Sequence, residues 1–468
     1  MLFASPTFLF FFLPLCVGGY FAARGMKARN AVLLVASWLF YAWGEPIYVL
    51  LMLAMTGVNF GWARAIDARE GRARKAMLAG AAATNLGVLA IFKYAGFVVG
   101  TLNAVLEPAG VSLPVPQIPL PLGISFFTFH ALSYVIDVFR RRFAANRNLS
   151  EVALYLVFFP QLIAGPIVRY KTIAGQLRRR RHTLGRASAG LRIFIIGLAQ
   201  KLLIADAFAP SADALFDHAQ RPGLLEAWLG VTAFALQIYF DFAGYSNMAI
   251  GLGLVFGFSL PRNFRRPYAS ASITEFWRRW HISLSTWFRD YLYIPLGGNR
   301  GPAWKTWRNL VIVFLLCGLW HGASWTFVLW GAWHGGFLVI ERAGLGQLLA
   351  RVPRPVGWLY AIVAVWGGWV LFRSADLASA AEIWSGMAGL HGLGSLHPEA
   401  AYAFTEQVRW LLPVAAVLAV APMRWRTTQQ LWRRPTAWAD NLMLASLAAL
   451  SLLQVAAGAF SPFLYFRF

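Results

Sequence analysis

Three of the chain's eight histidines lie among aromatic residues in its carboxyl-terminal half, where their surroundings suit proton transfer. His321 lies in Cys317-Gly318-Leu319-Trp320-His321-Gly322, within a run from 310 to 340 that contains no Asp, Glu, Lys or Arg. An ionisable side chain inside a membrane segment is costly and is therefore a functional-site hypothesis by default. Imidazole also exchanges its proton near neutral pH, as general acid–base catalysis requires. The alternative is a structural histidine bonded to a backbone carbonyl.

The other two histidines raise a question of geometry. On one continuous helix His334 and His321 would lie about 20 Å apart along the axis and on nearly opposite faces. They serve one substrate only if the helix breaks between them, so His334 is either a supporting side chain across a bend or structural. His281 lies in 275–290, where Trp, Phe and Arg recur at helical spacing. This pattern predicts an interfacial amphipathic helix, or a helix that lines the cytoplasmic mouth of a cavity.

The composition identifies an integral membrane protein. Of the 468 residues, 59% are hydrophobic and 13% are charged, whereas soluble domains have about 25% charged residues. We expect one all-α, multi-pass membrane domain over 1–468, with 1–23 retained as the first span, because that segment lacks a basic start and a small-residue cleavage pattern. The two cysteines, Cys16 and Cys317, exclude a disulfide framework and form no metal-binding pattern.

The net charge of +23 is distributed in short basic clusters between apolar segments. This distribution is typical of the positive-inside bias rather than of nucleic-acid binding, although contacts with lipid headgroups or a phosphorylated cofactor remain an alternative. Basic clusters at 24–29, 64–75, 140–142, 262–308 and 424–434 are placed in the cytoplasm, with the amino terminus and the acidic segments 206–226 and 376–406 outside. The candidate spans are 7–23, 31–43, 47–63, 76–92, 121–139, 187–207, 227–258, 310–340, 356–372, 410–421 and 438–460.

Two segments satisfy this topology only if they are broken. Residues 152–168 contain two prolines and precede the basic run 178–181, so we expect a re-entrant element. Irregular backbone at membrane depth is tolerated only where protein or a water-filled cavity covers it. Residues 310–340 are too long for one span, and we expect a broken or re-entrant pair around 318–322. No internal repeat is visible, which weakens an inverted-repeat transporter interpretation.

Several strings together resemble the signature of the membrane-bound O-acyltransferases, and within that family the alginate-type branch of bacterial polysaccharide O-acetyltransferases. The resemblance covers essentially the whole chain. It implies about 10–12 transmembrane helices plus re-entrant helices around a central tunnel, in the bacterial inner membrane. The strings are Pro121-Leu122-Gly123-Ile124-Ser125-Phe126-Phe127-Thr128-Phe129, Ala164-Gly165-Pro166-Ile167, Tyr239-Phe240-Asp241-Phe242-Ala243-Gly244-Tyr245-Ser246, Asn263-Phe264-Arg265-Arg266-Pro267-Tyr268, Trp280-His281-Ile282-Ser283-Leu284-Ser285, Arg289-Asp290-Tyr291-Leu292-Tyr293 and Gly318-Leu319-Trp320-His321-Gly322.

The resemblance also implies roles for individual residues. His321 takes the position of the signature histidine and is expected to be the general base, with a covalent acyl-histidine as the open alternative. His281 takes the upstream signature position, where it would orient the acyl donor or stabilise the oxyanion. The position of Asn247 is commonly Asp in relatives, which leaves a polarising role there in doubt, and Asp241 would be a substitute. Candidate supporting residues are His334, Asp241, Asn247 and Asp290. Separately, the predicted cytoplasmic side offers candidate donor-binding cations, which the positive-inside bias explains just as well: Arg262, Arg265, Arg266, Arg278 and Arg279.

The implied reaction is transfer of acetyl from a cytoplasmic donor, acetyl-CoA, to an extracytoplasmic polysaccharide such as alginate or a cell-wall glycan. No metal or tightly bound cofactor is expected, and a second, extracytoplasmic acetyltransferase is an expected partner. Two alternatives stay open. One is transfer of D-alanyl or another acyl group by the same family, and the other is a transporter or flippase that performs no bond chemistry.

Overall fold

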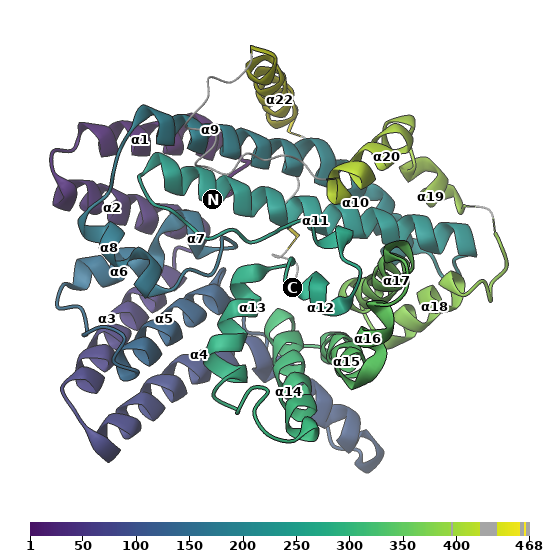
Figure 1. Cartoon of the computed structure of the whole chain (residues 1–468), viewed down its shortest axis with the longest axis horizontal. Coiled ribbons are helices and arrows are strands. Elements are labelled where there is room, and N and C mark those ends of the chain that lie inside the picture. The colour runs from purple at the N-terminus through teal and green to yellow at the C-terminus, as the bar shows by residue number, and fades with distance from the viewer. Residues whose placement is uncertain (395, 422–437, 459–462, 465–468) are drawn as a thin grey trace. The chain divides into compact units, whose positions relative to one another are not determined.

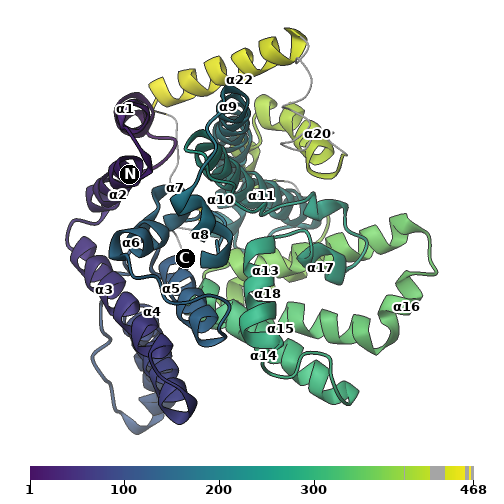
Figure 2. The same cartoon turned by 60° about the vertical axis from the view of Figure 1, so that its left-hand side comes forward.

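The computed structural model describes residues 1–394, 396–421, 438–458 and 463–464, and within these ranges the chain is helical and contains no strand (Figures 1 and 2). This confirms the all-α class. The chain divides into two compact units, Met1–Phe194 with Ser246–Pro261, and Ile195–Tyr245 with Arg262–Phe468. Helices α9 (Leu184–Ala199) and α11 (Leu224–Val255) each contribute residues to both units.

Unit 1 is built around two helices that share a buried amide pair. Asn59 on α3 and Asn85 on α4 each donate a hydrogen bond from Nδ2 to the other's Oδ1, at 3.0 and 2.7 Å. In an apolar medium, hydrogen bonds between side chains of this kind add to van der Waals packing in holding two helices together. The helices of this unit are η1 (Thr7–Phe12), α1 (Leu13–Ala22), α2 (Met26–Gly44), α3 (Tyr48–Asp67), α4 (Gly71–Leu106), η2 (Glu107–Ala109), α5 (Ile124–Phe139), α6 (Leu149–Val157), α7 (Phe159–Leu162), α8 (Tyr170–Arg178) and the first part of α9.

The predicted break within 152–168 is present. Helix α6 ends at Val157, α7 is a single short helix, and the backbone from 163 to 169 is irregular. Two side chains hold this irregular segment: the Val168 N–H donates to Nε2 of His130 (3.1 Å), and the Tyr155 hydroxyl lies 3.0 Å from the Val168 carbonyl. The buried N–H and carbonyl of Val168 are therefore satisfied by side chains of the same unit.

Unit 2 carries His281, His321 and His334. Its elements are η3 (Gln200–Ala205), α10 (Asp206–Asp213), η4 (Ala214–His218), most of α11, η5 (Pro267–Ala269), α12 (Ile273–Trp277), α13 (Ile282–Phe288), η6 (Arg289–Tyr293), α14 (Ala303–His321), α15 (Trp325–Ile340), η7 (Glu341–Leu345), α16 (Gly346–Leu349), α17 (Arg354–Arg373), α18 (Leu377–Met387), α19 (Pro398–Ala403), α20 (Glu406–Val420) and α22 (Trp438–Ala456). Helices α15 and α17 pack on one another, and α12 packs on both.

Five helical segments in the described ranges are long and apolar enough to cross a membrane, which supports a multi-pass protein. They are Tyr48–Asp67, Gly71–Ala109, Leu184–His218, Arg354–Arg373 and Trp438–Ala456. The expected total of 10–12 crossings and the central tunnel stay predictions. The predicted basic cluster at 424–434 and the last residues of the predicted span 438–460 lie outside the described residues.

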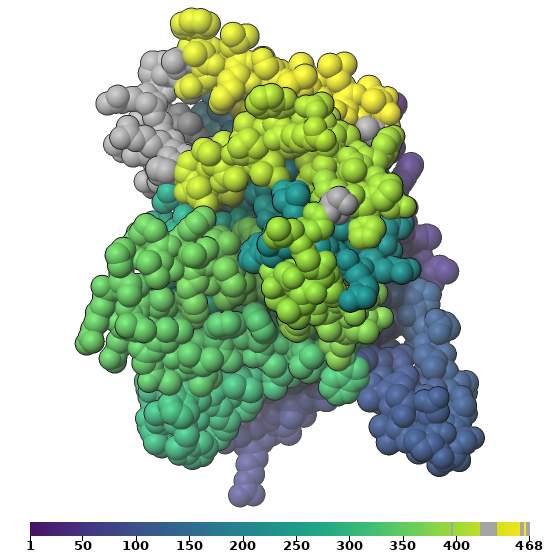
Figure 3. Space-filling model, turned by 90° about the vertical axis from the view of Figure 1, so that its right-hand side faces the viewer, coloured from purple at the N-terminus to yellow at the C-terminus, as the bar shows by residue number. Residues whose placement is uncertain are grey.

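Two segments that the charge pattern places outside the membrane pack together in unit 2. The Ser211 hydroxyl on α10 donates to the Ala403 carbonyl on α19 at 3.0 Å. Arg373 forms ion pairs with Asp213 (2.8 Å) and Asp217 (2.7 Å). In Figure 3 the teal atoms of this region emerge between the yellow-green atoms of α18 to α20. Segments some 190 residues apart in the sequence thus pack together; their position outside the membrane stays a prediction.

Candidate active site

The predicted break within 310–340 is a tight helical hairpin. Helix α14 ends at His321, α15 begins at Trp325, and the two helices lie side by side (Figures 1 and 2). Glycines allow this approach, because a Cβ on Gly318 would lie 2.2 Å from the Phe327 carbonyl oxygen and one on Gly331 would lie 2.3 Å from the Phe314 carbonyl oxygen. His321 therefore lies at the end of α14, and the backbone of α15 packs directly against the backbone of α14.

His321 is enclosed by aromatic rings. Its side chain is almost fully buried, and its ring centroid lies 4.8 Å from Trp320, 5.0 Å from Trp330 and 5.3 Å from Phe372. The carbonyl end of α14 points toward this position, and a helix carboxyl terminus favours a cation. The site therefore combines a dry environment with a dipole that stabilises the imidazolium formed when the ring takes a proton.

His281 approaches the same aromatic cluster from another element. It precedes α13 in a left-handed backbone conformation (φ 42°), which is uncommon for a residue with a Cβ. Its ring lies 4.6 Å from Phe242 and 6.2 Å from Trp320, centroid to centroid. One indole, that of Trp320, thus contacts both His281 and His321, so the structure brings the two predicted catalytic histidines to a common neighbour.

Asn263 holds His281. Two backbone hydrogen bonds, Arg265 N–H to the Arg279 carbonyl and Ile282 N–H to the Asn263 carbonyl (both 2.9 Å), lay the two segments alongside each other. The Asn263 Oδ1 then lies 3.1 Å from His281 Nδ1. The other ring nitrogen, Nε2, is buried and has no hydrogen-bond partner among the described residues. Sequence reasoning missed this amide, although Asn263 opens one of the strings that carry the family resemblance.

His334 lies on α15, across the bend from His321. The Trp330 ring lies 5.0 Å from both imidazoles, and Trp277 lies 5.1 Å from His334. His334 is fully buried, and neither ring nitrogen has a hydrogen-bond partner in the part of the chain that the structure describes. A Cβ on Gly368 would lie 2.6 Å from its Nε2. The two histidines therefore share an indole neighbour, which is the arrangement expected of a supporting residue across a bend.

The two acidic candidates have partners of their own. The Asp241 carboxylate forms an ion pair with Lys201 (2.8 Å) and accepts the Leu464 N–H (2.7 Å). Asp290 forms an ion pair with the adjacent Arg289 (2.7 Å). Asn247 lies on the part of α11 that is grouped with unit 1. Sequence reasoning also missed Lys201, a buried cation in the apolar segment 187–207.

A hollow of about 460 Å³ adjoins both histidine-bearing segments. Ile282, next to His281, lines it, as does Cys317, which is one helical turn before His321. Of the five candidate donor-binding arginines, Arg278 lines this hollow, and Arg279 is ion-paired with Glu275. The other lining residues are Thr274, Trp277, Leu284, Ser285, Thr286, Phe288, Arg289, Tyr293, Leu310, Val313, Phe314 and Leu338.

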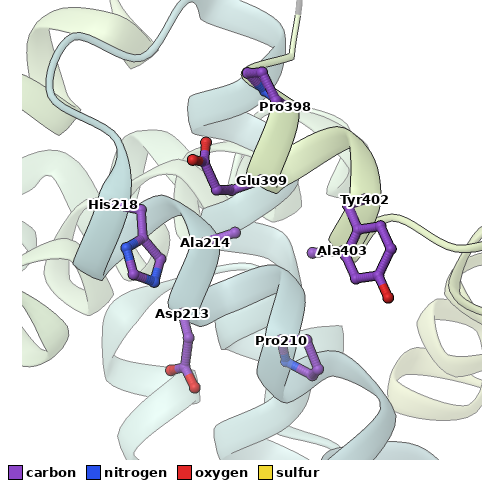
Figure 4. A pocket seen from close by; sticks show the side chains of 8 residues that line it. All are labelled: Pro210, Asp213, Ala214, His218, Pro398, Glu399, Tyr402 and Ala403. Atoms are coloured by element: carbon purple, nitrogen blue, oxygen red, sulfur yellow. The ribbon is translucent and has the colours of Figure 1, made fainter.

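A second hollow, of about 490 Å³, lies on the segments predicted to be outside (Figure 4). The side chains of Glu399 on α19 and of His218 and Asp213 on the α10–η4 segment reach its margin. Its remaining lining residues are Pro210, Ala214, Pro398, Tyr402 and Ala403. Charge and position therefore distinguish the two hollows: one adjoins the histidines and carries two arginines, whereas this one is acidic.

Comparison with known proteins supports the resemblance seen in the sequence. Residues 121–371 match the model of the membrane-bound O-acyltransferase family. The chain is 42% identical to a probable alginate O-acetylase of Azotobacter vinelandii, over 100% of both chains. It is 45% identical to a probable alginate O-acetylase of Pseudomonas aeruginosa, over 83% of this chain and 75% of the relative. It is also 35% identical to a peptidoglycan O-acetyltransferase of Helicobacter pylori, over 85% and 81%.

Proposed function

The chain belongs to the membrane-bound O-acyltransferase family, and we propose that it passes acetyl from cytoplasmic acetyl-CoA across the bacterial inner membrane for O-acetylation of an extracytoplasmic polysaccharide. The family makes it a multi-pass membrane enzyme, an O-acyltransferase, which removes the transporter alternative. The observation that carries the proposal is the shared contact of His281 and His321 with Trp320, beside a hollow that holds arginines.

In the proposed reaction, an acceptor hydroxyl attacks the carbonyl carbon of the thioester while Nε2 or Nδ1 of His321 takes the hydroxyl proton. The new C–O bond forms, the C–S bond breaks, and the thiolate leaves with the proton that the imidazolium returns. A positioned general base contributes about 10²–10⁴-fold, and the dry aromatic surroundings strengthen each electrostatic contact. A covalent acetyl-His321 intermediate would use the same residue as nucleophile.

The hollow between α12–α13 and α14 suits the donor. Arg278 and Arg289 line it and are exposed, so phosphates can reach both guanidinium groups, of which that of Arg289 also forms the ion pair with Asp290. Its wall along α14 is apolar and ends at Cys317, one turn before the proposed base. We assign the phosphates of acetyl-CoA to these arginines and its acetyl-bearing arm to the apolar wall. His281 would then orient the donor.

The relatives support a polysaccharide as the proposed acceptor class. The probable alginate O-acetylases match over the whole chain or most of it, and the peptidoglycan O-acetyltransferase matches over most of it. Acetyl is therefore favoured over D-alanyl as the acyl group, and a polysaccharide as the final acceptor. Because this polymer lies outside the cytoplasm, we propose that a second, extracytoplasmic acetyltransferase completes the transfer.

Gene deletion with complementation tests this function. Secreted and wall polysaccharides from the deletion strain should lose O-acetyl esters, and the wild-type gene should restore them. Membranes given labelled acetyl-CoA should yield labelled ester, whereas membranes given labelled D-alanine on a carrier protein should not. Unchanged O-acetylation in the deletion strain, or ester formed from D-alanine alone, would contradict the proposal.

A further inference from the structure

We infer that Asn263 is a positioning residue that fixes the tautomer of His281, so that neutral His281 presents an unprotonated Nε2 to the substrate. The inference rests on the proposed function only in the role it gives to His281. The amide and the imidazole are both almost completely buried, and they belong to the same unit. Their contact is therefore a fixed part of the packing rather than a surface encounter.

The identity of the amide atom follows from a third group. The side-chain atom of Asn263 that faces His281 also lies 3.2 Å from the Ser283 backbone nitrogen and 2.9 Å from the Ser283 hydroxyl. A backbone N–H can only donate, so the atom that meets it must be the amide oxygen and not the NH2 group. The orientation of the Asn263 amide is thus set by a donor whose role is unambiguous.

The tautomer of His281 follows in turn. Because the amide oxygen can only accept, the Nδ1 that lies 3.1 Å from it must carry the hydrogen. In the neutral ring the hydrogen is then absent from Nε2, which keeps a free lone pair. This Nε2 is buried and has no partner among the described residues. Neutral His281 can therefore accept a hydrogen bond from an O–H or N–H of the substrate, but it cannot donate one to an oxyanion.

The unprotonated Nε2 distinguishes between the two roles that the sequence leaves open for His281, orientation of the acyl donor and stabilisation of the oxyanion. Orientation of the donor through an accepted hydrogen bond is compatible with the geometry, whereas stabilisation of the oxyanion requires a protonated Nε2. An amide also differs from a carboxylate in this position, since it orients the ring without supplying the negative charge that would favour imidazolium. The left-handed backbone of His281 is strained, and the contacts around the ring must offset that strain.

The groups around His281 leave the amide as its principal polar neighbour. Its ring contacts are aromatic: Phe242 on α11, Phe264 beside Asn263, and Trp320 on α14. Three charged or titratable side chains near His281 have contacts of their own. Asp241 is ion-paired with Lys201, Arg279 is ion-paired with Glu275, and His321 is surrounded by the rings of Trp320, Trp330 and Phe372.

Nitrogen NMR of the full-length protein labelled with ¹⁵N-histidine tests the inference directly. The His281 signals are identified by their loss in His281→Phe. We expect a protonated Nδ1 and an unprotonated Nε2 in the wild type, and a mixture of tautomers in Asn263→Ala. The matched control is Asn309→Ala, because Asn309 is equally buried but donates to the carbonyls of Leu296 and Gly298. That variant should keep the His281 tautomer.

Kinetics supply a second readout. Asn263→Ala should lower kcat/KM for acetyl transfer by about 10–100-fold, the usual effect of losing an orienting partner. Asn263→Asp should keep the orientation but add a charge that stabilises imidazolium, so the acid limb of the pH–rate profile should move up by about 1 pH unit or more. Ser283→Ala keeps the backbone donor and should leave the profile unchanged.

A protonated Nε2 in the wild type would overturn the inference, even if neither Asn263 variant folds. So would an Asn263→Asp enzyme whose acid limb coincides with that of the wild type. Failure of the proposed function has a different signature: no ester would form in any variant, while the tautomer of His281 would still be read from the spectrum.

Discussion

The ammonium group of Lys201 lies 2.8 Å from the carboxylate of Asp241, and both side chains are buried. A second carboxylate, that of Asp206, lies 2.6 Å from the same ammonium. The segment from Gln200 to Ala205 is a π-helix, a form that widens a helix by one residue and recurs at functional sites. Asp241 is therefore part of a buried ion cluster. Its neighbour on α11, Phe242, is the residue whose ring lies against His281.

Removing the cation of this cluster should destabilise the protein strongly. Lys201→Met would leave two buried carboxylates without their counter-ion, and breaking a buried pair typically costs about 3–5 kcal/mol. Denaturant or thermal unfolding in detergent measures the effect. The matched control is Glu70→Gln, which removes the exposed pair of Glu70 with Arg141 (2.7 Å) and should cost at most about 1 kcal/mol. Equal losses in the two variants would show that the cluster is solvated.

A methyl group at the α14–α15 contact should disrupt the site. Gly318→Ala would place a Cβ 2.2 Å from the Phe327 carbonyl oxygen, so the helices must separate. Overpacking of this kind costs about 1–3 kcal/mol, and a displacement of His321 by about 1 Å would lower kcat by about 10²-fold. The control is Gly336→Ala on α15, where an added Cβ would meet nothing within 4 Å. It should keep full activity, and equal activity of the two variants would refute the role given to the close approach.

Arg278 should contribute to donor binding. Arg278→Gln should raise KM for acetyl-CoA by about tenfold or more, because a hydrogen bond to a charged group contributes about 1.5–3 kcal/mol. With the chemistry untouched, kcat should stay within about twofold of the wild type. Steady-state kinetics at varied acetyl-CoA measure both constants. Arg300→Gln removes an exposed arginine that does not line the hollow and serves as the control. Identical KM values for the two variants would contradict the assignment of the acetyl-CoA phosphates to Arg278.

His182 should make the stability of unit 1 depend on pH. Its Nε2 lies 2.7 Å from the Tyr20 hydroxyl, and its Nδ1 lies 3.3 Å from Arg29. Burial, followed by the positive charges of Arg29 and Arg180, lowers the pKa of His182 below its usual value. The folded protein therefore prefers the neutral ring, and the stabilisation is complete above about pH 6.5 and is lost as the pH falls.

The melting temperature of the wild type should therefore fall more between about pH 7.5 and pH 5.5 than that of His182→Gln, whose side chain does not titrate in this range. Thermal unfolding of both proteins in the same detergent provides the comparison. Parallel slopes against pH would show that His182 does not titrate on unfolding.

Much of the architecture follows from length, hydropathy and charge. The break at 318–322 was predictable because 31 apolar residues fit neither one upright span nor two comfortably, and the basic residues that follow had to return to the cytoplasmic side. The break within 152–168 followed from its prolines and from the basic run after it. In both places the physics of the bilayer acts on a whole segment, so a single sequence contains enough information.

The interior of the site was less predictable. Asn263 and His281 are 18 residues apart, in two loops that are held together by two backbone hydrogen bonds. Such a contact produces no periodic pattern in the sequence, so it could not be predicted. Asp241 appeared to be available for a histidine, but Lys201, forty residues before it, takes the carboxylate. Which arginine lines the hollow also depends on local turns: Arg278 and Arg279 are adjacent in sequence, yet Arg279 is bound by Glu275.

The most direct test of the account is acetyl transfer by His321→Ala. Wild-type protein and the variant, shown by matching melting curves and gel-filtration profiles to be folded, are each expressed in the deletion strain, and membranes that retain the extracytoplasmic partner are given labelled acetyl-CoA with the polysaccharide that loses its esters in that strain. We predict that the variant loses at least about 10²-fold in turnover, the lower bound for a general base. Turnover near that of the wild type in the folded variant would contradict it.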